Sequence, residues 1–102
     1  MLTIEEIKKI VTPICKRYDV ERLSLFGSYA RGEADEKSDV DLIVDYGDNM
    51  GGFAYFGFCG DIEDALGMDT DLVSRNGMRA KFLSEIAKDE VIIYEEHANE
   101  NR

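Results

Sequence analysis

The feature that most restricts the fold is a pair of short apolar runs, residues 23–26 and 40–45, with a polar segment between them. The first run stops at Gly27-Ser28, and Asp39 and Asp41 mark the start of the second run after ten intervening residues. Both runs have the length and composition of β-strands. Because side chains alternate along a strand, the two carboxylates should emerge on one face about 6 to 7 Å apart.

This spacing combines two kinds of group that bind a nucleoside triphosphate. Glycine lets the backbone approach a phosphate closely, and the Ser28 hydroxyl can donate a hydrogen bond to a phosphate oxygen. Backbone N–H groups at the start of a helical turn, expected at residues 28–31, also attract phosphate. Paired carboxylates bind divalent cations. A Gly-Ser pair or an Asp-x-Asp alone is an ordinary turn or strand end in most proteins, and the distance between them is what indicates a site.

The rest of the apolar pattern predicts further helices and strands. Thr3 and Glu6 have the spacing of a capping box before residues with helical periodicity, and Pro13 should bend this first helix or end it early. Two more helices and two more strands are expected, in residues 53–66, 69–74, 78–86 and 91–94. This order predicts an α/β (α+β) domain, with a mixed sheet of about four strands covered by helices.

Composition limits the class of protein. A chain of 102 residues suffices for one packed domain, expected over residues 1–95, with a frayed tail at residues 96–102 that contains His97. The net charge of −10 disfavours direct nucleic-acid binding, because such binders gain affinity from Lys and Arg. The acidity predicts a solvated surface or, alternatively, a basic protein partner. No signal peptide or membrane-length apolar run is found, so we expect a cytoplasmic protein that does not bind membranes.

Several side chains near the motif allow two interpretations. Arg31 could contact phosphate or form an ion pair with an acidic side chain at residues 33–36. Ser38 could bind phosphate or cap the loop. The aromatic cluster at residues 53–58 could stack on adenine, face a partner or form part of the core, and core is the usual role of such a stripe. Tyr29, beside the expected phosphate turn, could be exposed.

The block Gly-Ser-x-Ala-Arg-Gly, followed by Ser-Asp-x-Asp-Leu, resembles the DNA polymerase beta type nucleotidyltransferase superfamily. The sequence is most similar to its minimal nucleotidyltransferase (MNT) group, the antitoxin partners of HEPN-domain RNase toxins. The resemblance extends over residues 23–94 and implies the polymerase beta-like fold. It also implies a third carboxylate in a segment of the form Leu-Gly-x-x-hydrophobic-Asp-Leu-Val, which selects Asp71. Asp69 points to the same strand face and remains an alternative to Asp71.

The resemblance implies an Mg²⁺-dependent transfer of AMP from ATP. Asp39 and Asp41 would bind Mg²⁺ together with triphosphate oxygens, and Asp71 would help to bind a second Mg²⁺ near the acceptor hydroxyl. Contacts to the nucleotide would come from Gly27, Ser28, Arg31 and Ser38. The implied acceptor is a hydroxyl, most simply a tyrosine side chain, of a cognate HEPN RNase toxin that the transfer silences.

Other functions would use the same fold differently. A non-catalytic antitoxin would neutralise the toxin by binding alone, with the carboxylates as relics. A small-molecule nucleotidyltransferase, or the nucleotide-binding half of a split enzyme, would need an acceptor domain for which a chain of this length has no room. A phospho-receiver domain is also acidic and α/β, but it gives the Gly-Ser spacing no role and therefore ranks last.

Overall fold

The computed structural model describes residues 1–96, so His97 and the rest of the expected tail at 97–102 lie outside the described part. The elements follow in the order α1 (Ile4–Arg17), β1 (Val20–Phe26), α2 (Gly27–Arg31), β2 (Val40–Tyr46), α3 (Gly52–Leu66), β3 (Thr70–Ser74), α4 (Ala80–Ala87) and β4 (Val91–Glu95). This order is the one that the sequence predicts, with bounds shifted by up to three residues. None of the helices in residues 1–96 has the length and apolar character needed to cross a membrane.

The four strands form one mixed sheet, as predicted, and their order in the sheet is β3-β2-β1-β4. β1 is antiparallel to β2 and to β4, whereas β2 and β3 are parallel and are joined through α3. The direction of the first two strands, which the sequence left open, is thus antiparallel. This pairing brings the end of β1 beside the start of β2, where Phe26 is the register partner of Asp41.

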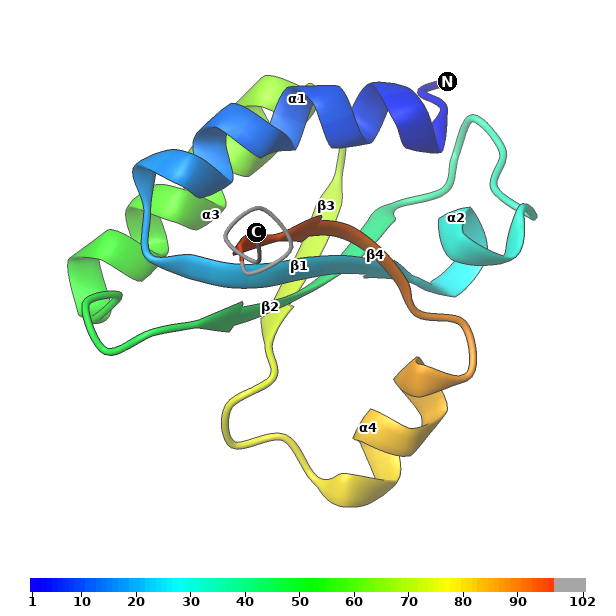
Figure 1. Ribbon diagram of the computed structural model, residues 1–102. Helices are drawn as coiled ribbons and strands as arrows, with labels where there is room; N and C mark the ends of the chain where they lie inside the picture. The colour runs from blue at the N-terminus through cyan, green and yellow to red at the C-terminus, as the bar shows by residue number, and fades with distance from the viewer. Residues whose placement is uncertain (97–102) are drawn as a thin grey trace, which may run out of the picture.

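The helices are divided between the two faces of the sheet (Figure 1). α1 and α3 cover one face, and the main core lies between them and the sheet; it includes Ile7, Val11, Leu23, Leu25, Leu42, Val44, Phe58 and Ile62. α4 lies on the opposite face, and Ile86 is its only buried residue. Leu42 and Val44 of β2 point into the main core. Because side chains alternate along a strand, the Asp41 side chain points to the other face of the sheet, on the side of α4.

The first helix begins with the predicted capping box. The Glu6 backbone N–H donates to the Thr3 hydroxyl at 3.0 Å, and the Thr3 backbone N–H donates to the Glu6 carboxylate at 2.8 Å. The helix does not end early at Pro13 but continues for four more residues. Ile14 and Cys15, which follow the proline, are buried. Their packing offsets the backbone hydrogen bond that the proline cannot make.

The aromatic residues of α3 are divided between the core and the surface. Phe58 is fully buried, and its ring packs edge to face against Tyr18 with 5.5 Å between the ring centroids. Phe53 and Phe56 are 97% and 72% exposed. The expectation of a core stripe is therefore right for Phe58 and wrong for these two residues.

Candidate active site

The turn at Gly27 connects β1 to α2 and packs directly against the side chain of Asp41. Gly27 has a φ of 73°, in the left-handed region that favours glycine. A Cβ atom at this position would also collide with the Asp41 carboxylate. The Gly-Ser and Asp-x-Asp motifs are therefore in contact in the folded chain, although ten residues separate them in the sequence.

α2 is anchored in the core by Tyr29. This side chain is only 4% exposed, and its hydroxyl donates to the Met68 sulfur at 3.9 Å. Tyr29, for which the sequence allowed an exposed position, is instead buried, because the short helix turns its second side chain after Gly27 inward. Burial of this ring holds the Gly27-Ser28 turn at a fixed place beside the sheet.

Asp39, Asp41 and Asp71 are brought to one end of the sheet. Asp41 is the second residue of β2, Asp39 directly precedes that strand, and Asp71 is the register partner of Asp41 on the parallel strand β3. Asp39 and Asp71 are exposed, whereas Asp41 is partly buried. Burial first, and then the charges of Asp71 and Asp39, raise the pKa of Asp41, with Arg31 acting in the opposite direction. Arg31 therefore compensates the ionised form of Asp41 only in part.

The donor chemistry of these three carboxylates fits a hard divalent cation such as Mg²⁺. A cation would offset the repulsion from Asp71 and Asp39 that contributes to the raised pKa of Asp41. Within residues 1–96, however, no three Asp, Glu, His or Cys side chains stand close enough together to surround one ion. The strand register therefore brings the three residues to one place, and cation binding has to include a reorientation of their side chains.

Of the two candidates for the third carboxylate, Asp71 is favoured. Asp69 precedes β3, and its carbonyl oxygen accepts a hydrogen bond from the Val40 backbone N–H at 3.0 Å. Among these two aspartates, it is Asp71 that contributes to the raised pKa of Asp41. Asp69 thus joins the ends of β2 and β3 through its backbone, while Asp71 shares the electrostatic environment of Asp41.

Arg31 and Ser38, the further candidates for nucleotide contacts, both make local interactions. The Arg31 guanidinium donates to Glu33 and to Asp89, each at 2.9 Å. The ion-pair interpretation is therefore supported, with Asp89 as a partner that lies too far away in the sequence to be predicted. The Ser38 hydroxyl accepts a hydrogen bond from the Asp35 backbone N–H at 2.9 Å, as a loop cap does.

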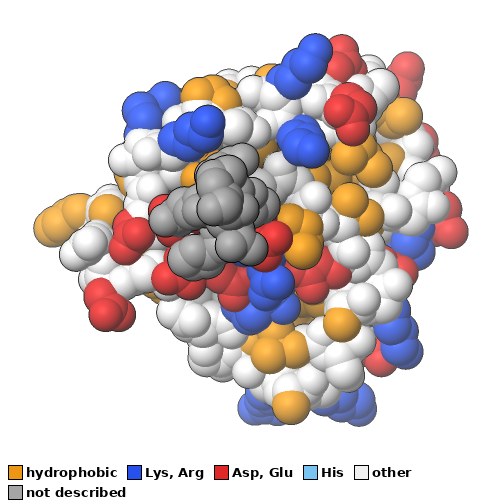
Figure 2. Space-filling view, in the orientation of Figure 1, with side chains coloured by type: hydrophobic (Ala, Val, Ile, Leu, Met, Phe, Trp, Pro, Cys, Tyr) orange, Lys and Arg blue, Asp and Glu red, His pale blue; other side chains and the backbone are white. Residues whose placement is uncertain are grey.

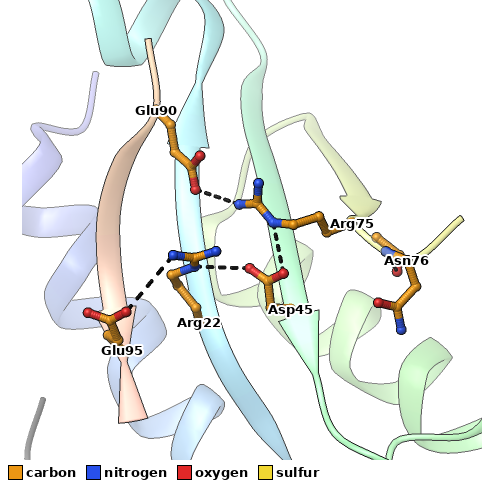
Figure 3. A network of polar contacts seen from close by, with 7 residues as sticks. Arg22, Asp45, Arg75, Asn76, Glu90 and Glu95 are labelled. Atoms are coloured by element: carbon orange, nitrogen blue, oxygen red, sulfur yellow. Dashed lines mark hydrogen bonds and ion pairs between the residues drawn. The ribbon is translucent and has the colours of Figure 1, made fainter. Parts of the chain in front are cut away.

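A polar network that the sequence reasoning missed lies on the face of the sheet that carries the carboxylates (Figure 3). Arg75 approaches Asp45 to 2.8 Å and also donates to Glu90. Arg22 donates to Asp45 at 3.1 Å and lies 4.0 Å from Glu95. The network links β1, β2, β4 and the segment after β3. The sequence contains one indication of this network. Asp45 lies four residues after Asp41 in β2, so the alternation of side chains along the strand places both carboxylates on the same face of the sheet.

Arg75→Met is expected to destabilise the protein by about 2 kcal/mol at pH 7, because Asp45 and Glu90 would keep partly buried charges without this partner. Burial alone raises the pKa of Glu90, but the Ser24 hydroxyl and Arg75 outweigh it and hold the pKa below 4.5. The stability due to this pair is complete above pH 4.5 and is lost as the pH falls through the lowered pKa. Urea unfolding should therefore show a smaller difference between the two proteins in acid. The matched control is Arg79→Met, and an equal loss there would contradict the prediction.

Comparison with known proteins identifies the family. The sequence model of the family described as "Polymerase beta, Nucleotidyltransferase" matches residues 6–99. Protein adenylyltransferase MntA of Thermococcus cleftensis is 33% identical over 97 residues, which cover 91% of this chain and 98% of that protein. The match therefore extends well beyond the motifs, over nearly the full length of both proteins.

Solved structures share the fold as well. A chain in the crystal structure of a toxin–antitoxin with AMP-PNP gives a TM-score of 0.74 at 19% sequence identity, over 90% of this chain and 76% of that one. A chain in the structure of the tri-AMPylated Shewanella oneidensis HEPN toxin in complex with MNT antitoxin gives 0.69 at 16% identity, over 96% and 77% of the two chains.

A mixed sheet with a glycine turn set against a strand carboxylate, together with these matches, defines a nucleotidyltransferase. The chain belongs to the polymerase beta nucleotidyltransferase family and, by its match to MntA over nearly the full length of both proteins, to the MNT group within it. The resemblance drawn from the motifs is thereby confirmed. Membership of this family implies a nucleotide substrate and a divalent metal.

Proposed function

We propose that the chain is an Mg²⁺-dependent protein adenylyltransferase that transfers AMP from ATP to a tyrosine hydroxyl of a cognate HEPN-domain RNase toxin, and so silences the toxin. The observation that carries the proposal is the packing of the Gly27 turn against Asp41, with Asp39 and Asp71 beside it. A relative named as a protein adenylyltransferase and a structural neighbour with an AMPylated HEPN toxin support the choice of acceptor.

The proposed roles follow from the place of each residue. Backbone N–H groups of the turn and the Ser28 hydroxyl donate hydrogen bonds to the triphosphate. Asp39, Asp41 and Asp71 would hold two Mg²⁺ ions, which would neutralise charge on the phosphates. Asp71 accepts the proton of the acceptor hydroxyl, whose oxygen attacks the α-phosphorus in line as pyrophosphate leaves. The chain thus contributes positioning and charge.

The direct test is to incubate the protein with Mg-ATP and the HEPN-domain protein of the same organism, and to weigh the latter by mass spectrometry. A mass increase of one or more adenylyl groups on a tyrosine, with loss of RNase activity, is the expected result. An unchanged mass in a reaction where the protein demonstrably binds both ATP and the HEPN protein would contradict the proposed function.

Neutralisation by binding alone is the second candidate function, and one observation favours it. The carboxylate side chains in residues 1–96 do not stand ready to surround a cation. The double variant Asp39→Ala/Asp41→Ala separates the two functions, because it removes two proposed metal ligands and leaves the rest of the surface intact. If it protects cells from the toxin as well as the wild type does at equal expression, binding suffices.

Mg-ATP is expected to stabilise the wild-type protein, because its Mg²⁺ ion would offset the repulsion among the three carboxylates. At a hundredfold excess over Kd the gain is about 2.7 kcal/mol, which corresponds to a shift of several degrees in melting temperature for a domain of this size. Differential scanning fluorimetry with ATP alone, Mg²⁺ alone and both together measures it. The Asp39→Ala variant should show a much smaller shift, and an equal shift would contradict the site.

A further inference from the structure

The outer face of α3 combines exposed aromatic side chains with acidic ones. Phe53 and Phe56 are 97% and 72% exposed, although side chains of this size are normally buried. The same helix face continues through Gly60 to Glu63 and Asp64, because residues three, four and seven positions apart share a face. All three of these residues are exposed. Hydrophobic side chains project at the left edge of the molecule, over the N-terminal end of α3 (Figure 2).

The charged side chains of α3 are all negative. α3 carries three acidic residues, Asp61, Glu63 and Asp64, and no Lys or Arg. Asp45 and Asp61 are paired with arginines from other segments. Within residues 1–96, Glu63 and Asp64 make no such ion pair. A partner that covers this face would therefore gain by presenting Lys or Arg beside its apolar side chains.

The shape of the face favours a helix as the occupant. A Cβ atom built on Gly60 would meet nothing within 4 Å, so the middle of the face is flat and a second helix can approach the α3 backbone closely. Beside Phe56 lies a hollow of about 460 Å³, wide enough to receive a side chain, which is lined by Tyr46, Asp48, Met50, Tyr55 and Asn76 among others. Aromatic walls with one carboxylate suit the stem and charged end of a Lys or Arg.

We propose that the outer face of α3 is the docking surface for a basic amphipathic helix of the partner protein. This inference rests on the proposed function, in which the partner is the HEPN-domain protein. The surface borders the carboxylate site, because Gly60 and Glu63 line a hollow of about 250 Å³ together with Asp71. Binding at α3 would hold the partner in place while another part of it, carrying the acceptor hydroxyl, reaches the site.

The test measures affinity for the purified HEPN-domain protein by calorimetry. Phe53→Ser/Phe56→Ser is expected to weaken binding by at least about thirty-fold, because exposed aromatic anchors carry most of the energy of such interfaces. Gly60→Gln should also weaken binding and yet raise the melting temperature, since it adds a side chain to the contact and replaces glycine within a helix. The matched control is Phe82→Ser, which removes a half-exposed phenylalanine from α4 on the other face of the sheet.

The outcomes separate this inference from the proposed function. If the double Phe variant and Gly60→Gln both bind the HEPN protein with wild-type affinity, the docking surface is wrong and the proposed function stands. If the wild type binds Mg-ATP but not the HEPN protein, the proposed function and the docking surface both fail. If light scattering instead shows a wild-type dimer that the double Phe variant abolishes, with no change in HEPN affinity, the face binds a second copy and the inference is overturned.

Discussion

Replacing Asp41 with asparagine is expected to lower the rate of adenylyl transfer by about a thousandfold, because it removes charge from the centre of the site. Asparagine keeps the size of the side chain, so its packing against Gly27 is retained. The same change should raise the melting temperature of the ligand-free protein, since burial and the charges of Asp71 and Asp39 disfavour the ionised form of Asp41. Mass spectrometry of the HEPN protein over time and calorimetric unfolding measure the two effects.

The gain in stability should depend on pH. The pKa of Asp41 is raised above 3.8 in the folded protein, so the folded state holds this proton more tightly than the unfolded chain does. Wild-type protein therefore recovers stability as the pH falls through the raised pKa. The advantage of Asp41→Asn should be present at pH 7 and disappear toward pH 3.8. An advantage that is constant with pH would mean that the side chain acts through something other than its charge.

Asp69→Asn is the matched control for this variant. It makes the same chemical change two residues from Asp71, on a side chain that is exposed and whose residue contributes its backbone carbonyl to the sheet. Transfer and melting temperature should stay near the wild-type values. A loss of transfer in Asp69→Asn equal to that in Asp41→Asn would show that the choice of Asp71 over Asp69 is wrong.

The parts of the structure that the sequence predicts well are those determined by neighbouring residues. The capping box at Thr3 and Glu6 needs only a spacing of three, and the strand from Val40 needs only its run of apolar residues. Gly27 and Asp41 are separated by thirteen residues, and their place in one site was still predictable because both belong to a known motif. In each case the identity and spacing of the residues involved suffice to predict the feature.

The parts that could not be predicted depend on which distant segments meet. Arg31 pairs with Asp89 across 58 positions of sequence, and nothing local distinguishes that partner from the closer acids. Tyr29 is buried because α2 turns it toward the core, whereas Phe53 is exposed because α3 turns it away from the sheet. Both are aromatic, so hydrophobicity alone assigns them the same environment. Only the direction in which the packed helix presents each side chain separates them.

Gly27→Ala is expected to destabilise the protein by about 3 kcal/mol, the sum of a left-handed conformation in a residue with a Cβ atom and a collision with a well-packed neighbour. The collision is with the Asp41 carboxylate, so relief of the clash moves a proposed metal ligand. Displacement of a catalytic group by about 1 Å can cost a hundredfold in rate, and transfer should fall at least that far in the fraction that remains folded. Urea unfolding and the transfer assay measure the two losses.

Gly32→Ala separates the two causes. Gly32 ends α2 with a φ of 75°, almost the same as that of Gly27, but a Cβ atom there would meet nothing within 4 Å. Alanine at this position carries only the conformational cost, about 1 kcal/mol, and should leave transfer unchanged. The difference between the two variants in stability and in transfer rate therefore measures the effect of the clash between a Cβ atom at Gly27 and the Asp41 carboxylate. If Gly32→Ala loses as much transfer as Gly27→Ala, backbone conformation alone explains the need for glycine in the turn, and contact with Asp41 does not.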